Sequence, residues 1–412
     1  MTAALAAMTL AACGSTLPRD LETWNEADAM GGEPAAGERP SPSCLAGSPT
    51  PRPGAGEDGA EGGKSGGEWR VAYYDYRDRL AGLAVTREKT VWVAGTRVPH
   101  ACGPETSAPL LLRGDGGGWR EVATPPVAEP RAVAAASDRD VWLFGDRTAA
   151  RWNGRRWTTA PGLGWRPDRV HAAAPGDVWA IVKANFLDGA GGAEIEGSWS
   201  SRADLRHWDG AAWRTARPPL VAKDVDGLPG GEVWVAGSSR GRAAVARWNG
   251  WSWSTVPLPA VPALHRNQLS ELVDLAVDES GRVAAVGWVA WVCGTEEEDV
   301  TFCGSTLLLR RENGRWSYSL MSDPELDPHL RLEADGRGGF WLFYAKNEWN
   351  TAVRHLSGGE WTQGTFPVGP LGHTRLASVV REPGTARVWV VAADDTEREE
   401  PPYRGSGIWV AG

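Results

Sequence analysis

The sequence predicts an all-β fold built from repeated units, and three observations support this class. The phrase RWNGRRW at 151–157 returns in modified form at 207–213 and at 247–253. A Val-Trp pair before small residues lies upstream of nearly every copy, as at Val141 and Trp142. The chain also contains 24 Trp against 6 Phe and 6 Tyr, which indicates a repeated packing role for tryptophan. Two phrases that recur in a fixed order are typical of a repeat architecture.

Each repeat contains four short β-prone runs. In one copy an alanine-rich run begins at Arg131, the Val-Trp run follows at 140–145, and a third run enters the phrase at Arg151. An Asn-Gly or Asp-Gly dipeptide then leads into a fourth run at the second tryptophan, and such dipeptides between β-prone runs are strong hairpin signals. Four short antiparallel strands per repeat predict one blade of a β-propeller.

The second tryptophan of the phrase counts the blades. Six copies supply Trp119, Trp157, Trp213, Trp253, Trp316 and Trp361. A seventh copy, SGGEW at 65–69, has the same letters as 357–361, whereas the last repeat ends without a fourth strand. We therefore predict seven four-stranded antiparallel blades, closed by an N-terminal strand at 66–74 that completes the last blade. Such closure removes exposed sheet edges.

The blades are expected at the following positions. They span 79–124, 131–160, 169–217, 221–257, 271–321, 329–366, and 375–412 together with 66–74. The fifth blade departs from the pattern, because Val283-Ala284-Ala285 stands where the Val-Trp pair belongs. Long loops are predicted on one face of the ring, at 96–108, 183–203, 288–305 and 393–406. Loops on a rigid scaffold are frequent binding sites.

The N-terminal region reads as a leader and a linker. Residues 1–13 end in LAAC, which resembles the lipobox of bacterial lipoproteins and implies a lipid anchor on Cys13; a chance cysteine in an alanine-rich start is the alternative. Residues 14–64 are rich in Gly, Pro, Ala, Ser and Glu, a composition that predicts a disordered tether. The propeller is expected over 65–412, on the outer face of the cell membrane through the lipid alone, or secreted.

The remaining four cysteines fit an exported protein, because disulfides persist in oxidising compartments. Cys293 and Cys303 flank an acidic insertion and are predicted to close it, which leaves Cys44 and Cys102 for a second disulfide. No cysteine pair has the close spacing expected of zinc ligands. We predict no metal and no cofactor.

Charge restricts the partners. The net charge of −9 argues against a nucleic-acid partner. Cations open the innermost runs and are expected to surround the channel mouth, with two histidines just upstream; these residues are Arg79, Arg131, Arg169, Lys223, Arg331, Arg375, His329 and His373. Arginine suits carboxylates and phosphates, so an anionic ligand is one interpretation; ion pairs between neighbouring blades are the other.

The acidic loops predict a surface for a basic partner, a weak calcium site, or a solvated rim. The segment Asp224 to Gly227 has only part of a calcium-loop pattern.

The repeats over 69–412 resemble the exported β-propeller proteins of high-GC bacteria, and more distantly the WD40 and kelch repeats. This resemblance implies an architecture rather than an activity. No His-Glu-x-x-His motif is present, and His171, His207 and His355 are expected to be structural. We predict a monomeric binding module for a protein or for an anionic or carbohydrate ligand. An extracytoplasmic hydrolase or lyase acting at the channel mouth is the alternative, and a purely structural envelope protein is the third hypothesis.

Overall fold

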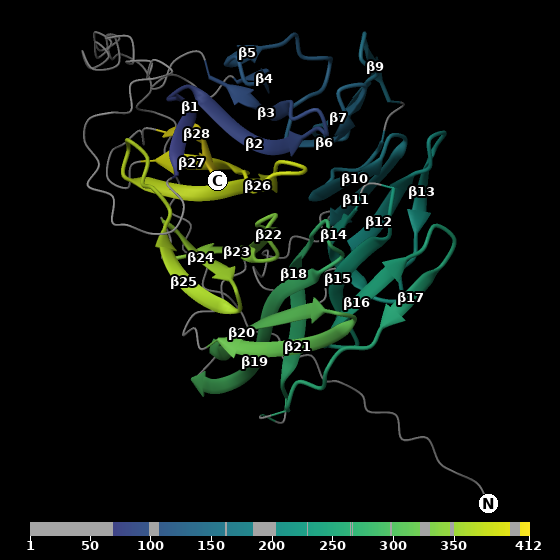
Figure 1. Cartoon of the computed structure of the whole chain (residues 1–412), viewed down its shortest axis with the longest axis vertical. Coiled ribbons are helices and arrows are strands. Elements are labelled where there is room, and N and C mark those ends of the chain that lie inside the picture. Colours follow the sequence, from purple (N-terminus) through teal and green to yellow (C-terminus); the bar gives the residue numbers. More distant parts are fainter. Residues whose placement is uncertain are drawn as a thin grey trace, which may run out of the picture. The chain divides into compact units, whose positions relative to one another are not determined.

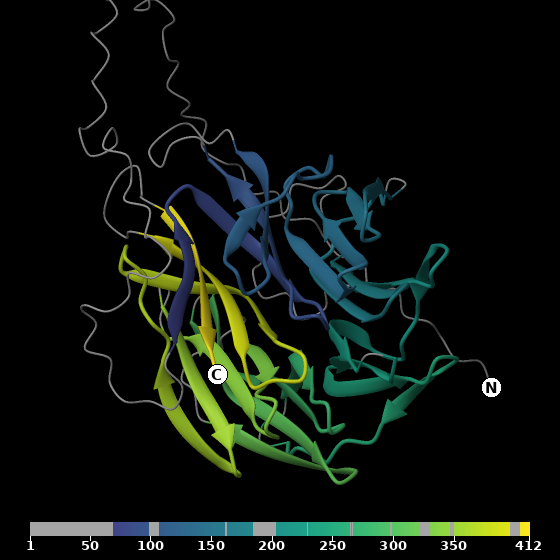
Figure 2. The same cartoon turned by 45° about the horizontal axis from the view of Figure 1, so that its top comes forward.

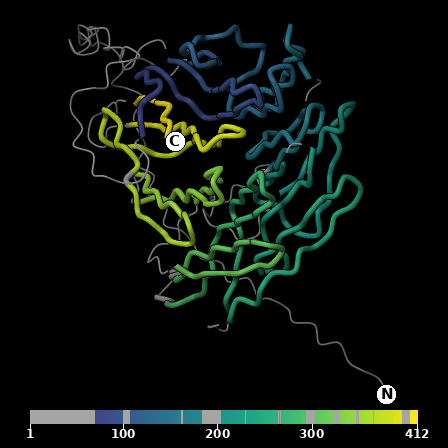
Figure 3. Tube along the Cα trace, in the orientation of Figure 1, coloured from purple at the N-terminus to yellow at the C-terminus, as the bar shows by residue number. Residues whose placement is uncertain are grey.

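The structure is an all-β ring. The computed structural model describes residues 69–98, 107–160, 163–183, 203–228, 230–263, 265, 267–296, 299–321, 330–346, 350–395 and 404–412. In these ranges all regular secondary structure is β-strand, and the strands form seven four-stranded antiparallel sheets. Figures 1 and 3 show the sheets as blades that follow one another around a central axis, from purple to yellow. The predicted seven-bladed propeller is confirmed.

Each blade is a meander, and the first strand of each blade faces the axis (Figure 1). Blades 1 and 2 are β2 (Asp78–Val85), β3 (Val91–Arg97), β4 (Ala108–Gly114) and β5 (Trp119–Glu121), then β6 (Ala132–Ser137), β7 (Asp140–Phe144), β8 (Ala149–Trp152) and β9 (Trp157–Thr159). Blades 3 and 4 are β10 (Arg169–Ala174), β11 (Asp177–Lys183), β12 (Ala203–Trp208) and β13 (Trp213–Ala216), then β14 (Val221–Gly227), β15 (Val233–Ser239), β16 (Arg242–Trp248) and β17 (Trp253–Val256).

The second half of the ring has the same order. Blades 5 and 6 are β18 (Leu269–Val277), β19 (Val283–Glu296), β20 (Asp299–Glu312) and β21 (Arg315–Met321), then β22 (Arg331–Ala334), β23 (Phe340–Ala345), β24 (Thr351–Ser357) and β25 (Glu360–Thr365). Blade 7 is β26 (His373–Arg381), β27 (Val388–Asp395), β28 (Arg404–Ala411) and β1 (Arg70–Asp75).

Blade 7 closes the ring with the two ends of the propeller. β1 pairs antiparallel with β28, in a register that places Arg70 opposite Val410 and Asp75 opposite Ser406. Figure 2 shows purple β1 beside the yellow C-terminal strands. The buried Tyr74 hydroxyl donates a hydrogen bond of 2.7 Å to Asp394, which ties β1 to β27 as well. The predicted N-terminal closing strand is therefore present.

The Asn-Gly turn of the repeated phrase is held by its own side chain. The Oδ1 atom of Asn153 accepts hydrogen bonds from the backbone N–H groups of Arg155 and Arg156, each 3.0 Å long. Gly154 has a φ of +90°, a conformation that favours glycine. The turn places Trp152 directly opposite Trp157 across the hairpin. The phrase thus sets the register of the third and fourth strands.

The two repeated tryptophans join neighbouring blades. The Val-Trp tryptophan of one blade meets the second tryptophan of the next blade edge to face, with ring centroids 5.4–6.4 Å apart. The pairs are Trp92–Trp157, Trp142–Trp213, Trp179–Trp253, Trp234–Trp316, Trp341–Trp69 and Trp389–Trp119. Buried Ala284 takes the tryptophan position in blade 5, and Trp361 of blade 6 packs against the cluster that contains it. The tryptophans therefore act as packing between blades, as the repeat predicts.

The cation or histidine that opens the phrase covers the Val-Trp ring of its own blade. His207 stacks on Trp179 at 3.8 Å and contacts Asp177 at 2.8 Å. His355 stacks on Trp341 at 3.9 Å, and Arg151 takes a similar place over its own tryptophan. The predicted structural role of His207 and His355 agrees with these contacts.

Blade 5 differs from the sequence interpretation. The segment 288–305 was expected to be a loop, but β19 and β20 continue through it as a long hairpin, with residues paired from Val283↔Arg311 to Glu296↔Asp299. The reason is local: a β-prone run of Val, Ala and Trp occupies 288–292, and a disulfide joins Cys293 to Cys303 across the two strands. The expected loop at 393–406 is also shorter, because β27 extends to Asp395 and β28 begins at Arg404.

Candidate functional site

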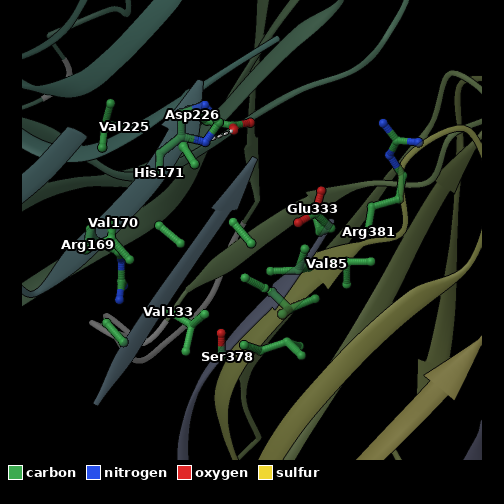
Figure 4. A pocket seen from close by; sticks show the side chains of 18 of the residues that line it. Val85, Val133, Arg169, Val170, His171, Val225, Asp226, Glu333, Ser378 and Arg381 are labelled. Carbon is green, nitrogen blue, oxygen red and sulfur yellow. Dashed lines mark ion pairs between the residues drawn. The ribbon is translucent and has the colours of Figure 1, made fainter. Parts of the chain in front are cut away.

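The first strands of the seven blades surround a cavity of about 340 Å³ on the ring axis. Figure 4 shows side chains from several blades that converge on this space. Its volume lies at the lower end of the range for small-molecule sites, roughly 300 Å³ and above. The cavity can therefore hold a small ligand.

The cavity has two contrasting walls. β2, β6 and β26 contribute small or apolar residues over 81–85, 132–136 and 377–380. β10, β14, β18 and β22 contribute the charged residues Arg169, His171, Asp224, Asp226, Asp274, Arg331 and Glu333. Alanine and glycine fill little volume, so these three strands leave the cavity open in front of the charged wall. Gly82 is required there, since a Cβ atom at this position would lie 2.6 Å from the backbone oxygen of Arg131.

Two carboxylates and two guanidiniums form the first layer of the charged wall. Arg169 Nε lies 3.6 Å from Asp224 Oδ1, and Arg331 Nε lies 3.7 Å from Asp274 Oδ2. Both distances exceed that of a hydrogen bond. The backbone N–H of Leu275 donates a hydrogen bond of 2.9 Å to Asp224 Oδ2, which holds this carboxyl against β18, the strand of Asp274. The two carboxyls are close enough for the charge of Asp274 to act on Asp224.

Burial controls the protonation of this layer. Desolvation, followed by the charge of Asp274, raises the pKa of Asp224 well above its usual value. Desolvation also raises the pKa of Asp274 to about 6, although both guanidiniums oppose this change. Desolvation lowers the pKa of Arg331, and the neighbouring charge of Arg169 acts in the same direction. The two guanidiniums are thus close enough to repel each other.

A second layer lies further along the same strands. His171 Nδ1 contacts Asp226 Oδ1 at 3.1 Å, the ion pair drawn as a dashed line in Figure 4. The Val277 N–H donates a hydrogen bond of 2.8 Å to Asp226 Oδ2, which fixes the carboxylate between blades 4 and 5. Burial and then the charge of Asp226 raise the pKa of Glu333 to about 8. Glu333 is therefore predominantly protonated near neutral pH.

An ion pair lies at the far end of the cavity. Arg381 Nη2, at the end of β26, lies 3.2 Å from Glu279 Oε1, in the turn after β18. The backbone N–H of Gly384 donates a hydrogen bond of 2.7 Å to the same oxygen. Blades 5 and 7 thus meet at this end of the axis, next to a second pocket lined by Arg87 and Leu228.

Three of the predicted channel-mouth residues line the cavity, and the rest of those that the structure describes lie outside its lining. Arg131, Arg169 and Arg331 belong to the lining, although Arg131 also pairs with Glu129 at 2.8 Å. Arg79 donates hydrogen bonds to backbone oxygens, including that of Arg404. The remaining positions are as follows: Lys223 pairs with Glu271 at 3.4 Å, Arg375 is exposed, His373 lies at the start of β26, and His329 lies outside the described residues.

Irregular strand register explains why the sequence interpretation missed the carboxylates. The register of β14 shifts between Ala222 and Asp224, and that of β18 shifts between Leu272 and Asp274. Such a bulge moves the side chains after it to the opposite face. Asp224 and Asp274 consequently face the axis. The sequence does hold one signal for this placement: Asp274 lies inside an apolar run of Leu and Val, and a charge buried there needs a partner or a function.

The other predicted sites are placed as follows. The segment Asp224 to Gly227 belongs to β14 rather than to a loop. In the ranges that the structure covers, no cluster of His, Cys, Asp or Glu is arranged to hold a metal ion. Cys13, Cys44 and Cys102 lie outside these ranges, so their lipidation and pairing stay predictions. The Cys293–Cys303 disulfide indicates an oxidising, extracytoplasmic location. The part described contains no helix long and apolar enough to cross a membrane.

Comparison with known proteins finds distant structural similarity and no family. No family model matches the chain, and no curated protein matches it. Among solved structures, it is similar to YCF48 bound to a D1 peptide, with a TM-score of 0.47 and 13% identity over 85% of this chain and 97% of that chain. YCF48 from Cyanidioschyzon merolae gives a TM-score of 0.45 and 12% identity over 83% and 98%. The α-L-arabinanase of Penicillium chrysogenum complexed with arabinobiose gives 0.44 and 13% over 84% and 98%. At this similarity, neither a family nor an activity is assigned.

Proposed function

We propose that this protein is an extracytoplasmic binding module that takes a small ligand into the central cavity of its propeller. The observation that carries the proposal is the pair of contrasting walls around the 340 Å³ cavity. One wall offers charged groups and the other an alanine- and valine-rich surface. Ligand sites commonly combine apolar lining with a few placed polar groups.

The charged wall is poorly explained by stability alone. Taking charges out of water costs several kcal/mol per ion, and only close, well-formed pairs offset that cost. Here the ion pairs of Arg169 and Arg331 are both longer than 3.5 Å. A ring that needed only to close could fill its axis with apolar side chains. Loosely paired, desolvated charges in a cavity are instead typical of functional sites.

The proposed location includes a lipid anchor. The supporting features are the LAAC sequence that ends at Cys13 and the Gly- and Pro-rich segment that follows it. Cells supplied with a tagged fatty acid are expected to label the protein, and Cys13→Ser is expected to remove the label. Label that persists in Cys13→Ser would show that this cysteine is not the anchor.

A second candidate function is hydrolysis or elimination at the same cavity. It is favoured by the Asp224–Asp274 pair, because a carboxyl whose pKa is about 6 can act as a proton donor near neutral pH. A turnover assay distinguishes the two functions: an enzyme converts the bound compound, and Asp274→Asn slows that conversion without abolishing binding.

The test of binding is a thermal-shift screen of the full chain against small acids, amines, sugars and divalent cations. We expect at least one class to raise the melting temperature, since a ligand that binds only the folded state stabilises it. Ser378→Leu narrows the small-residue wall, where Ser378 lies beside the cavity (Figure 4), and it should abolish the shift. A shift of unchanged size in Ser378→Leu would place the binding outside the cavity and refute the proposal.

A further inference from the structure

The two guanidiniums of the first layer retain hydrogen-bonding capacity. Arg169 is ion-paired with Asp224 only at 3.6 Å, and its Nε has no hydrogen-bond partner in the described part of the chain. Figure 4 shows its side chain projecting from β10. Arg331 donates one hydrogen bond of 2.7 Å, from Nη1 to the backbone oxygen of Leu330. A guanidinium has five N–H donors in a planar fork, so both retain donors for a ligand.

The charge of this layer favours a monoanion. Burial raises the pKa of Asp224 and of Asp274, which reduces the negative charge beside the two guanidiniums. A single carboxylate brings one negative charge to these guanidiniums, whereas a phosphate dianion would bring a second one into a desolvated site that already holds two carboxyl groups. Carboxylates also match the guanidinium fork in a bidentate geometry.

The opposite wall specifies the rest of the ligand. Ala132 to Ala136 of β6, Ala81 to Val85 of β2 and Ala377 to Val380 of β26 supply a surface of methyl and isopropyl groups. A ligand anchored by its charged end on the arginines would lay its other end against these groups. Burial of that end removes apolar surface from water and favours binding. A short alkyl or aryl chain fits both the surface and the volume.

We propose that Arg169 and Arg331 form a clamp for the carboxylate of a small monoanionic organic acid, whose apolar body lies against the alanine-rich wall. This proposal rests on the proposed binding function and names its ligand class. It assigns Arg169 and Arg331 as direct contacts of the ligand and the Asp224–Asp274 pair as their internal counter-charge.

The counter-charge makes binding depend on pH. When Asp274 gains a proton near pH 6, its negative charge is lost and the two guanidiniums attract an anion more strongly. The charged groups that face the pair are Arg169, His171 and Asp168 from the β10 side, Asp226 from β14, and Arg331 and Glu333 from β22. Affinity for a carboxylate should therefore rise as the pH falls.

The experiment is calorimetric titration of the full chain with hexanoate, and with hexanamide and hexylamine as matched neutral and cationic probes. We expect binding of hexanoate alone, at least roughly tenfold weaker in Arg169→Gln and in Arg331→Gln, since a charge-assisted hydrogen bond is worth about 1.5–3 kcal/mol. Arg331→Lys keeps the charge and should give an intermediate affinity. Arg155→Gln, in an exposed hairpin turn, is the matched control and should bind like the unmodified chain. Melting temperatures verify that each variant is folded.

The outcomes separate this proposal from the broader one. Equal binding of hexanoate and hexanamide, or no effect of both arginine variants, would overturn the clamp. If hexanoate does not bind while a sugar or a cation does, and Ser378→Leu abolishes that binding, the cavity is a ligand site but the clamp is wrong. Between pH 7.5 and pH 6.0, hexanoate stays ionised; its affinity should rise more steeply in the unmodified chain than in Asp274→Asn, where Glu333 still gains protons. An equal pH dependence in the two proteins would contradict the assigned counter-charge.

Discussion

The periphery and the axis of this ring are built on opposite principles. Between blades, the same tryptophan contact recurs six times, with ring centroids 5.4–6.4 Å apart. In the part of the ring described, only blade 5 lacks the Val-Trp tryptophan and carries Ala284 at that position. At the axis, strands in equivalent positions carry alanine in β6, aspartate in β14 and arginine in β22. Repetition therefore serves closure of the ring. The lining of the axis is not repeated, which is the distribution expected of a site that recognises a ligand asymmetrically.

Removing β1 should have the largest effect. Deletion of residues 66–74 takes away the fourth strand of blade 7 and the Trp69 ring that packs on Trp341 and Phe366. We expect loss of the cooperative unfolding transition in thermal denaturation followed by circular dichroism. The control is deletion of residues 14–64, which should melt like the full chain. An unaltered transition in the 66–74 deletion would show that the ring does not need its N-terminal strand.

Truncation of one peripheral tryptophan should cost less but remain large. Trp142 is 1% exposed and packs on Trp208 and Trp213. Trp142→Ala is expected to lower the free energy of unfolding by about 3–5 kcal/mol, as for other large aromatic truncations in cores. Trp251 is the matched control, because it is 90% exposed in a hairpin turn and its replacement by alanine should stay within about 0.5 kcal/mol. Urea unfolding of both variants makes the comparison; similar losses would remove the distinction between packed and exposed tryptophans.

The effect expected at the axis is spread over several pH units and is small at any one pH step. The pKa of Glu333 rises from 4.5 to about 8 on folding, so the folded state holds its proton where the unfolded state has lost it. The contribution of Glu333 to the free energy of unfolding should therefore be largest below pH 4.5. It should fall as the pH rises to 8, by at most about 1.4 kcal/mol per pH unit. Glu333→Gln should flatten this slope in urea unfolding at pH 5, 6.5 and 8. A slope that is the same in the variant would assign it to other groups.

The same contrast explains what could be predicted from the sequence. The Asn-Gly turn at Asn153 and the paired tryptophans act locally, so their spacing was enough to predict seven blades and the closing strand. The axis depends on register, and bulges at Asp224 and Asp274 turn residues toward the cavity that a regular alternation would place elsewhere. Lys223, which was expected at the channel mouth, pairs instead with Glu271 of the next blade. The length of the blade 5 hairpin was missed because its acidic segment was interpreted as a loop.

Ring closure also has a consequence for how the chain folds. β1 and β28 are neighbours in space, yet Asp75 and its partner Ser406 lie near opposite ends of the sequence. A ribosome makes the chain from the N-terminus, so β1 is the first of the described strands to be synthesised, and it must wait unpaired until β28 follows. Contacts between such distant segments are slow to form and leave a strand edge open to wrong partners meanwhile. The pairing of β1 with β28 in blade 7 is therefore the last step of folding, and the unpaired edge of β1 is where a nascent chain most needs protection from wrong pairing.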